Sequence, residues 1–380
     1  MKIIVIGASI SGLFTAYLLA KEGVEVEVYE RTNTPGWPPR TLIVTSEIEN
    51  VLHFLPEEAI VNELRYIELF SRSKSARLEL SSPDLVIERE RLVKFLARMA
   101  EDAGAKIKVL HQFEGFAQFG KKVAVRFRNS ETNEEGQTSA DILVGADGAL
   151  SAVSGAASRN GHHLTTLHQA KVSLHEQADP STCQVWFDSN QTKYFYWLIP
   201  ESRETATVGL IADDSRQARA SLEAFLRERK LEPLEFQEAT VPFHRFGLMS
   251  GGQVPDRNVF FVGDAAAQVK VTTVGGVVTG LYGARALANA LLNGRNYPKE
   301  LRGLKFELDL HLLIRKVLNQ FRDEDYDELI GMLKGRLKGV LEEWNRDELR
   351  TGFLKLILTE PRLITLSAKA FFRSIICGRI

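Results

Sequence analysis

The first thirty residues alternate apolar runs with small-residue breaks in the order strand, turn, helix, strand. Lys2–Ile6 is a run of β-favouring residues and predicts a buried strand. A tight turn is expected over Gly7–Gly12, followed by a helix over Leu13–Lys21. Val24–Tyr29 alternates apolar and acidic residues, which is typical of a second strand. The pattern therefore predicts a βαβ unit at the start of the chain.

The rest of the chain divides into helical and extended stretches. Helical spacing predicts a helix over Glu88–Ala103, and the proline-rich segment Thr34–Pro39 predicts a loop. Strands are expected at Ile107–Leu110, at Lys121–Arg128, after the polar turn Asn129–Gln137, at Ile142–Val144 and at Val259–Val262.

Beyond residue 160 the composition changes twice. Many β-branched and aromatic residues from about Gln169 to Gly251 indicate an antiparallel sheet. A helix is expected over Gly276–Leu292, and the pattern from Lys299 to the end is helical, with a break at Glu360-Pro361.

Length and composition fit a globular protein with two or three compact units. The chain has 380 residues, of which 44% are hydrophobic and 26% charged. The formal net charge of −1 gives no reason to expect nucleic acid as a partner. Cys183 and Cys377 lie far apart and form no CxxC, so no metal site and no redox dithiol is expected. A reducing, cytoplasmic location fits this thiol content.

The apolar start from Lys2 to Ala20 could also be taken for a secretory signal peptide. Against that interpretation, the run contains a patterned glycine turn and continues directly into the second strand. No run of about 18 apolar residues follows, so we expect no membrane-spanning segment.

The turn between the first strand and the helix reads Gly7-Ala8-Ser9-Ile10-Ser11-Gly12. A pyrophosphate binds well at such a place, because free N–H groups and the helix dipole favour negative charge. Gly7 permits the tight turn, Gly12 permits close packing, and Ser9 stands where glycine is usual. Glu30 ends the second strand, where a carboxylate accepts hydrogen bonds from ribose hydroxyls and would repel a 2′-phosphate. The pattern predicts a Rossmann-type site for FAD or NAD; a chance glycine turn is the alternative.

Two further motifs place small residues and an aspartate directly after a buried strand. They are Gly145-Ala146-Asp147-Gly148 and Gly263-Asp264-Ala265-Ala266. The Asp264 carboxylate suits the hydroxyl groups of a ribityl chain, and the turn Thr272–Gly276 offers N–H groups and a helix N-terminus to a polar flavin edge. The alternative is that Asp147 and Asp264 only cap loops.

In this order and spacing the three motifs resemble the para-hydroxybenzoate-hydroxylase-type flavoprotein fold. The segment Gly263–Gly276 and the stretch Phe195-Tyr196-Trp197-Leu198-Ile199-Pro200 resemble signatures of the geranylgeranyl reductase family, and Arg89–Gly104 and Leu304–Arg315 are also similar to it. The resemblance implies FAD and the saturation of C=C bonds in a prenyl diphosphate, prenyl lipid or prenyl quinone. NAD(P)H and a reduced electron-carrier protein both stay open as electron donor.

The expected fold is therefore α/β: a Rossmann-type FAD-binding domain with an inserted antiparallel-sheet substrate domain and a C-terminal helical region. We expect the FAD-binding domain to be discontinuous, with residues 1–40, 85–155 and 252–295. Residues 41–84 and 156–251 would form the substrate domain, and residues 296–380 the helical region. The residues expected at the cofactor are Gly7, Ser9, Ile10, Ser11, Gly12, Glu30, Arg31, Arg40, Arg89, Asp147, Gly263, Asp264, Gly275 and Gly276.

The chain departs from the family pattern at several positions. Ala267, Val271 and Val274 stand where Gly, Pro and Gly are usual, and Ser154 stands where Arg is common. The loop after Glu30 reads Pro38-Pro39-Arg40-Thr41 instead of the Cys-Gly-Gly often seen in these reductases. This difference leaves the substrate open and makes Arg40 a candidate for cofactor contact.

Reduction of an isolated alkene requires hydride from flavin N5 and a proton on the other carbon, in a site that excludes water. Tyr194, Phe195 and Trp197 are candidates for the substrate pocket, with sheet core as the alternative for each. If the segment is a strand, Phe195 and Trp197 share one face, and Tyr194 and Tyr196 share the other. His244 is a candidate for the acid, with a structural role as the alternative.

The segment after Glu360 lacks acidic side chains and combines apolar residues with Arg362, Lys369, Arg373 and Arg379. Such a helix either lies on a membrane surface or docks on the protein's own core. Peripheral association of residues 361–380 with the inner face of a membrane would suit a hydrophobic substrate.

Two other functions fit the same motifs. An FAD-dependent aromatic monooxygenase would consume NADPH and O2. A non-catalytic flavin- or lipid-binding protein would hold flavin that no donor reduces productively.

Overall fold

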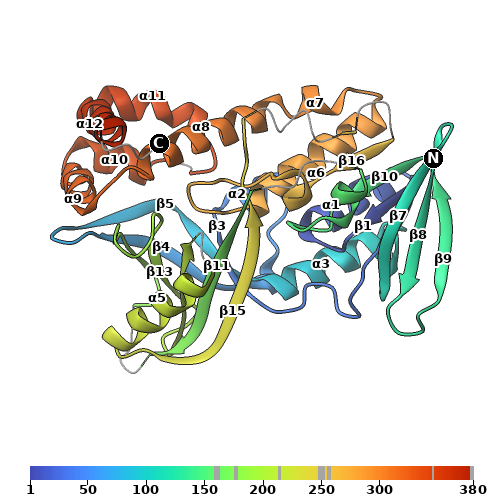
Figure 1. Ribbon diagram of the computed structural model, residues 1–380, viewed down its shortest axis with the longest axis horizontal. Coiled ribbons are helices and arrows are strands. Elements are labelled where there is room, and N and C mark those ends of the chain that lie inside the picture. The colour runs from blue at the N-terminus through green and yellow to red at the C-terminus, as the bar shows by residue number, and fades with distance from the viewer. Residues whose placement is uncertain are drawn as a thin grey trace.

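The computed structural model has a parallel-sheet part, a large mixed sheet and a group of C-terminal helices (Figure 1). It describes residues 1–157, 163–174, 179–212, 215–246, 253–254, 258–344 and 346–376. This arrangement confirms the predicted fold class.

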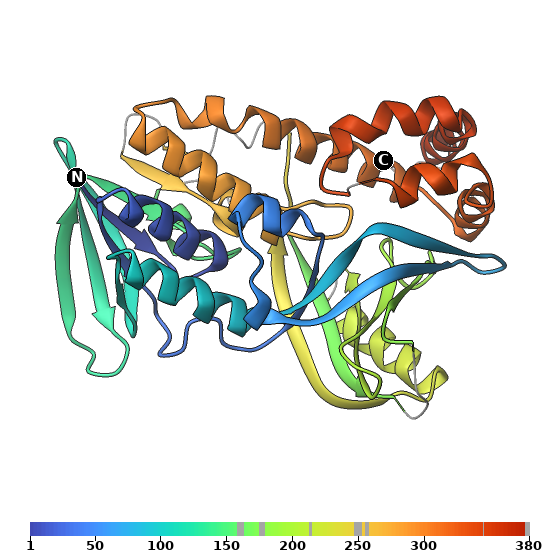
Figure 2. The same ribbon diagram turned by 180° about the vertical axis from the view of Figure 1, so that it is seen from behind.

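A five-stranded parallel sheet with the order β16-β10-β1-β2-β6 forms the N-terminal part. Its strands are β1 (Lys2–Ile6), β2 (Glu25–Tyr29), β6 (Lys106–Lys108), β10 (Ile142–Gly145) and β16 (Val259–Phe261). One face is covered by the helices α1 (Ile10–Lys21), α3 (Arg89–Asp102) and α6 (Val277–Leu292) (Figure 2). The other face packs on a three-stranded sheet of β7 (His111–Phe119), β8 (Lys122–Asn129) and β9 (Glu135–Ala140). Alternate residues of β1 supply the two cores, with Ile3 and Val5 toward the helices and Ile4 and Ile6 toward the small sheet.

An eight-stranded sheet with the order β15-β11-β14-β13-β12-β4-β5-β3 forms the second part. Its strands are β3 (Thr41–Val44), β4 (Ile60–Phe70), β5 (Ser75–Glu88), β11 (Leu164–Ser173), β12 (Thr182–Trp186), β13 (Tyr196–Pro200), β14 (Thr205–Ala212) and β15 (Glu232–Pro242). All neighbouring strands are antiparallel except β4 and β12. The short helices α2 (Glu47–Leu52) and η1 (Glu57–Ala59) connect β3 to β4, and α5 (Ser215–Glu228) covers one face of the sheet.

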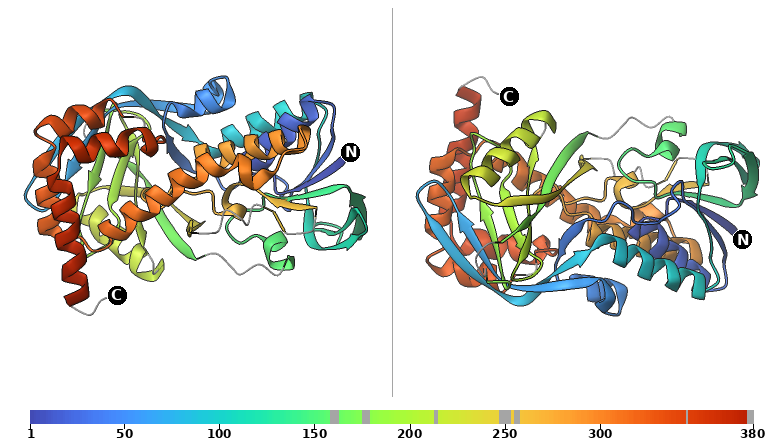
Figure 3. Two further views of the ribbon diagram at one scale, coloured as in Figure 1. Left: turned by 90° about the horizontal axis from the view of Figure 1, so that it is seen from above. Right: turned by 90° about the horizontal axis from the view of Figure 1, so that it is seen from below.

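Helices complete the molecule. The small helices α4 (Ala152–Ala156) and η3 (Gly263–Ala266) follow β10 and β16. The C-terminal helices are α7 (Tyr297–Glu300), α8 (Arg302–Leu318), α9 (Asp323–Met332), α10 (Arg336–Glu342), α11 (Leu349–Thr359) and α12 (Arg362–Ile376). Helix α8 leads from the parallel-sheet part to the terminal helices (Figure 3). Within the described ranges, no helix combines the length and apolarity needed to cross a bilayer.

Two of the local predictions for the parallel sheet and the small sheet packed on it differ from the structure. Helix α1 begins at Ile10 rather than Leu13, because the Ser9 hydroxyl accepts a hydrogen bond from the Gly12 amide and caps the helix. Strand β7 was missed, because alternation in its sequence is interrupted by Gly115, where the register with β8 shifts.

Close packing of α6 on the turn after β16 generates a stability prediction. A methyl group at Gly283 would lie 1.9 Å from Oε1 of Gln268. That side chain cannot move freely, because Oε1 accepts from the Gly263 amide at 2.7 Å and Nε2 donates to the Tyr297 hydroxyl at 3.1 Å. We expect Gly283→Ala to lower the free energy of unfolding by about 2 kcal/mol, measured by thermal and denaturant melts.

The matched control is Gly339→Ala in α10, where an added methyl meets no heavy atom within 4 Å. In an open helical position alanine should raise stability by about 0.5–1 kcal/mol. Equal losses at both glycines would contradict the packing argument.

Candidate cofactor and substrate site

The junction of β1 and α1 is built by two glycines. Gly7 has φ +99°, and a Cβ there would lie 2.5 Å from the carbonyl oxygen of Ala146, directly after β10. A Cβ at Gly12 would lie 2.4 Å from the carbonyl oxygen of Gly7. Helix α1 can therefore begin in contact with the neighbouring backbone. The first-turn amides of Ile10 and Ser11 have no acceptor inside the helix, which makes this end a site for an anion.

Glu30 lies beside the same turn. Its Oε2 accepts from the Ala8 amide at 2.9 Å, and its Oε1 accepts from the amide and the hydroxyl of Thr32, both at 2.9 Å. A carboxylate has about four acceptor positions, so it can also accept from sugar hydroxyls. The neighbouring Arg31 side chain is exposed.

Charged side chains gather at the end of β16: Arg40 and Arg89 both interact with Asp264, and Arg89 also interacts with Glu30 and Glu88. Asp264 lies on η3, and burial raises the pKa of its carboxyl group while Arg40 and Arg89 act in the opposite direction. Burial lowers the pKa of Arg40 to about 10, and Arg89 also lowers it. The Arg89 guanidinium donates to the carbonyl of Gly36 at 2.8 Å. Arg40 Nε is buried and has no hydrogen-bond partner among the described residues. This unpaired N–H suits an acceptor group of a ligand.

The two aspartates of the predicted motifs differ in their contacts. Asp147 accepts from the Ser151 hydroxyl at 2.6 Å and from the Val153 amide at 3.2 Å, so its side chain holds the start of α4. Asp264 instead faces the two arginines, and its Oδ1 lies 3.0 Å from the position of a Cβ on Gly276. Asp264 is therefore the aspartate whose side chain lies within the charged group.

Glycines on η3 and α6, on either side of the connecting turn, lie close to the start of α1. The Ser11 side chain packs against Gly263 and Gly280, where added Cβ atoms would lie 2.7 and 2.4 Å from its hydroxyl oxygen. The Lys270 amide donates to the Gly275 carbonyl at 3.0 Å and closes the turn. Ala267 and Val274 adopt φ +52° and +55°, the left-handed region, at two positions where the resembling family has glycine. Each such residue costs about 1–2 kcal/mol.

Apolar side chains fill the space between this turn and the face of the large sheet opposite α5. We call them the inner apolar cluster; its buried members are Leu64, Val86, Cys183, Tyr194, Trp197, Ile199, Ile211, Val241, Val269 and Val274, and Phe195 and Phe243 pack against it. Trp197 fits because its cross-strand partner is Gly209, where a Cβ would lie 2.4 Å from indole Cζ2. The indole Nε1 is buried without a hydrogen-bond partner among the described residues.

The prediction that Tyr194 and Tyr196 share a face is wrong. Tyr196 stacks on Phe225 of α5 at 4.4 Å between ring centroids, whereas Tyr194 belongs to the inner apolar cluster and stacks on Phe243 at 6.4 Å. Strand β13 begins only at Tyr196, and the Tyr194 amide donates to the Thr192 hydroxyl in a turn. Strand alternation therefore does not extend to Tyr194. Phe195 and Trp197 do lie together, with 6.1 Å between their ring centroids.

Polar groups at the border of the cluster were not predicted. Lys270 pairs with Asp347, which also accepts from the Thr45 hydroxyl. The hydroxyl of Thr272 lies 2.7 Å from Nδ1 of His311 on α8. Lys270 and His311 lie in two stretches that resemble the geranylgeranyl reductase family, and this resemblance was the only hint in the sequence that they belong to the site. Their partners lie far away in sequence. Among the described residues, no group of His, Cys, Asp and Glu is arranged to hold a metal ion. Cys377 and Arg379 lie outside the described residues.

Comparisons with known proteins agree with this geometry. A family model described as FAD binding domain matches residues 1–296. The digeranylgeranylglycerophospholipid reductase of Methanocaldococcus jannaschii is 26% identical over 95% of this chain and 96% of its own length. Digeranylgeranylglycerophospholipid reductase 2 of Methanothermobacter thermautotrophicus is 27% identical over 88% of this chain and 92% of its own length.

The fold agrees as well. The crystal structure of a geranylgeranyl bacteriochlorophyll reductase-like protein from Thermoplasma acidophilum superposes with a TM-score of 0.78 at 20% identity, over 97% of this chain and 98% of the other. The predicted resemblance to the geranylgeranyl reductase family is thereby confirmed. Because the family model spans well over half of its residues, the chain belongs to the FAD-binding-domain family of flavoproteins.

Proposed function

We propose that this protein is an FAD-dependent reductase that saturates C=C bonds of a geranylgeranyl-type prenyl lipid. The observation that carries the proposal is that Val269 and Val274, on the turn between η3 and α6, belong to the same apolar cluster as Trp197. A flavin held along this turn would face a dry, prenyl-like surface. The names of the similar reductases support this substrate class.

The residues present fit FAD. The amides at the start of α1 would hold the pyrophosphate, Glu30 the ribose, and Asp264 the ribityl hydroxyls. Gly275 and Gly276 would offer amides to the polar flavin edge, and Arg40 would find a partner for its buried Nε. The bound, reduced cofactor supplies hydride. The protein positions the alkene and excludes water.

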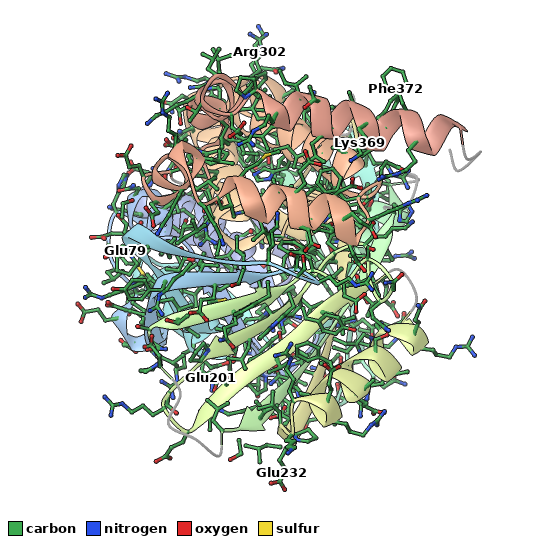
Figure 4. All side chains as sticks on the ribbon, turned by 90° about the vertical axis from the view of Figure 1, so that its left-hand side faces the viewer. Glu79, Glu201, Glu232, Arg302, Lys369 and Phe372 are labelled. Atoms are coloured by element: carbon green, nitrogen blue, oxygen red, sulfur yellow. The ribbon has the colours of Figure 1, made fainter. Side chains whose placement is uncertain are left out.

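The exposed face of α12 suits a lipid surface, as we also propose. Leu366 and Ala370 are buried against the neighbouring helices, but Ile364, Phe371 and Phe372 are 53%, 51% and 62% exposed. Figure 4 shows Phe372 pointing away from the body of the protein.

The basic residues of α12 that suggested membrane attraction have partners within the protein. Arg362 pairs with Glu360 at 2.6 Å, Lys369 pairs with Glu328 at 3.6 Å, and Arg373 pairs with Asp325. Contact with a bilayer would therefore rest mainly on the aromatic side chains.

Cofactor binding can be tested at Arg40. Replacing it with methionine removes a guanidinium that is repelled by Arg89 and whose buried Nε has no partner among the described residues, so the FAD-free protein should melt at a higher temperature. FAD affinity should fall about tenfold, equivalent to about 1.4 kcal/mol. The measurements are scanning fluorimetry of stripped protein and flavin titration. The exposed Arg91→Met on α3 is the control; unchanged FAD affinity in Arg40→Met would refute the role of Arg40.

The reaction is tested anaerobically, by reducing the flavin chemically and adding geranylgeranyl lipids. We expect flavin reoxidation and two hydrogens gained per bond. Trp197→Phe should slow reoxidation about tenfold, a loss of about 1.4 kcal/mol, without loss of FAD. Trp186→Phe is the matched control, because Trp186 is 9% exposed on the opposite face of the sheet. Reoxidation that needs O2 and an aromatic substrate would favour a monooxygenase, and flavin that no donor reduces productively would favour a carrier.

Membrane contact is tested by co-sedimentation with liposomes. The double variant Phe371→Ser, Phe372→Ser should bind at least about tenfold more weakly, since each exposed ring contributes roughly 1 kcal/mol or more. Phe119→Ser, which changes a 69% exposed ring at the end of β7, should bind normally. Equal binding of all three proteins would reject the role of α12.

A further inference from the structure

The proposed reaction needs a proton donor as well as a hydride donor. Each bond reduced gains a hydride on one carbon and a proton on the other, and water is excluded from an apolar site. The proton must therefore come from a side chain at the border of the cluster. Within the cluster itself, burial raises the pKa of the Cys183 thiol to about 12, so this thiol is a poor acid.

A chain of three polar residues runs from solvent to that border. The Lys305 side chain is 38% exposed and pairs with Asp309, which is 20% exposed. Asp309 Oδ1 lies 2.8 Å from Nε2 of His244, whose side chain is fully buried. The other ring nitrogen of His244, Nδ1, is buried and has no hydrogen-bond partner among the described residues. Exposure thus decreases stepwise from the ammonium to the imidazole.

His244 lies where the cluster meets the cofactor turn. The preceding residue, Phe243, packs on the cluster and stacks on Tyr194. Strand β15, which ends two residues before His244, contacts η3. Asp309 lies on α8, the same helix that places His311 on the hydroxyl of Thr272. His244 thus lies between the inner apolar cluster, which the preceding Phe243 joins, and α8, which supplies Asp309.

We propose that His244, oriented by Asp309, donates the proton to the alkene carbon. An imidazole with a carboxylate on one nitrogen and an open second nitrogen is the arrangement of a general acid–base pair. The N–H bond at Nδ1 breaks as the C–H bond forms, and the hydride comes from the reduced cofactor. The other ring proton stays on Nε2, which remains hydrogen-bonded to Asp309. The pair regains one proton from solvent per bond reduced. This inference rests on the proposed reductase function.

The second imidazole nearby is unsuited to the task. His311 Nδ1 contacts the Thr272 hydroxyl at 2.7 Å instead of a carboxylate. Burial lowers the pKa of His311 to about 3, with Lys270 and His244 acting in the same direction and Asp347 against it. The ring therefore lacks the direct carboxylate partner that would favour its protonated, proton-donating form.

The charges around His244 determine the direction in which a substitution of Asp309 or Lys305 should shift the pKa of His244. Burial lowers the pKa of His244 below its usual value of 6.5, Asp309 raises it, and Lys305 lowers it. The acid form is needed, so the rate of alkene-dependent reoxidation should fall as pH rises through a pKa below 6.5. Asp309→Asn should move this inflection to lower pH, and Lys305→Met should move it to higher pH. A purely structural role would shift neither inflection.

The test combines rapid-mixing reoxidation by a geranylgeranyl lipid with NMR titration of the histidine rings in the FAD-bound protein. His244→Gln should slow reoxidation by about 100-fold or more, with unchanged FAD content and unchanged chemical reduction of the flavin. His168→Gln is the matched control, because His168 is also buried and lies 3.7 Å from the carboxylate of Glu238. The pKa measured from the His244 resonance should equal the inflection of the wild-type rate against pH. Each charge variant should shift the pKa of the resonance and the inflection of the rate by the same amount and in the same direction.

The outcomes separate this inference from the function on which it rests. If the wild type is reoxidised and His244→Gln stays within about threefold of it, the role of His244 is overturned. The role of His244 is also overturned if the inflection of the rate differs from the pKa of the His244 resonance, or if neither charge variant shifts that inflection. Absence of reoxidation in the wild type with every prenyl lipid overturns the reductase proposal itself.

Discussion

Three segments that are far apart in sequence meet at the start of α1 because glycines let their backbones touch. Gly7 and Gly12 adjoin each other and Ala146 after β10, and Gly263 and Gly280 receive the Ser11 side chain. Any larger residue at these points would push α1 away from the ends of β10 and β16. The candidate anion site at the helix N-terminus and the position of Asp264 both depend on this contact. The candidate cofactor site and the close packing of the parallel-sheet part are therefore one feature of the structure.

The same region holds groups that are unfavourable in the free protein. Arg40 and Arg89 lie close enough to repel each other near Asp264, and burial lowers the pKa of both arginines. Ala267 and Val274 occupy left-handed backbone on the adjoining turn. Such costs persist where the surrounding structure fixes them, and they gather at binding sites. A ligand group that accepts a hydrogen bond from the buried Arg40 Nε would offset part of these costs, and binding would stabilise this region.

Short-range order in the sequence predicted most of the first βαβ unit and little of the substrate side. Strand β1 has the expected bounds, because a run of apolar residues followed by Gly7 leaves few other structures. Tyr194 was misplaced because its position depends on a turn held by Thr192. The pairing of Lys270 with Asp347, and of His244 with Asp309, joins residues 77 and 65 positions apart. Contacts of that range come from tertiary packing and leave no periodic trace in the sequence.

The chain's departure from the family pattern in the loop after Glu30 bears on the role proposed for His244. The loop that often carries Cys-Gly-Gly in those reductases carries Arg40 here, and the Arg40 guanidinium lies toward Asp264 on the cofactor side. A permanently charged guanidinium cannot deliver a proton. The proposed reduction would then need a proton donor elsewhere on the border of the inner apolar cluster, with a path to solvent that does not cross the cluster. Among the described residues, the path through Lys305 and Asp309 to His244 fits both conditions, because exposure falls from 38% to 20% to 0% along it and none of its three residues belongs to the inner apolar cluster.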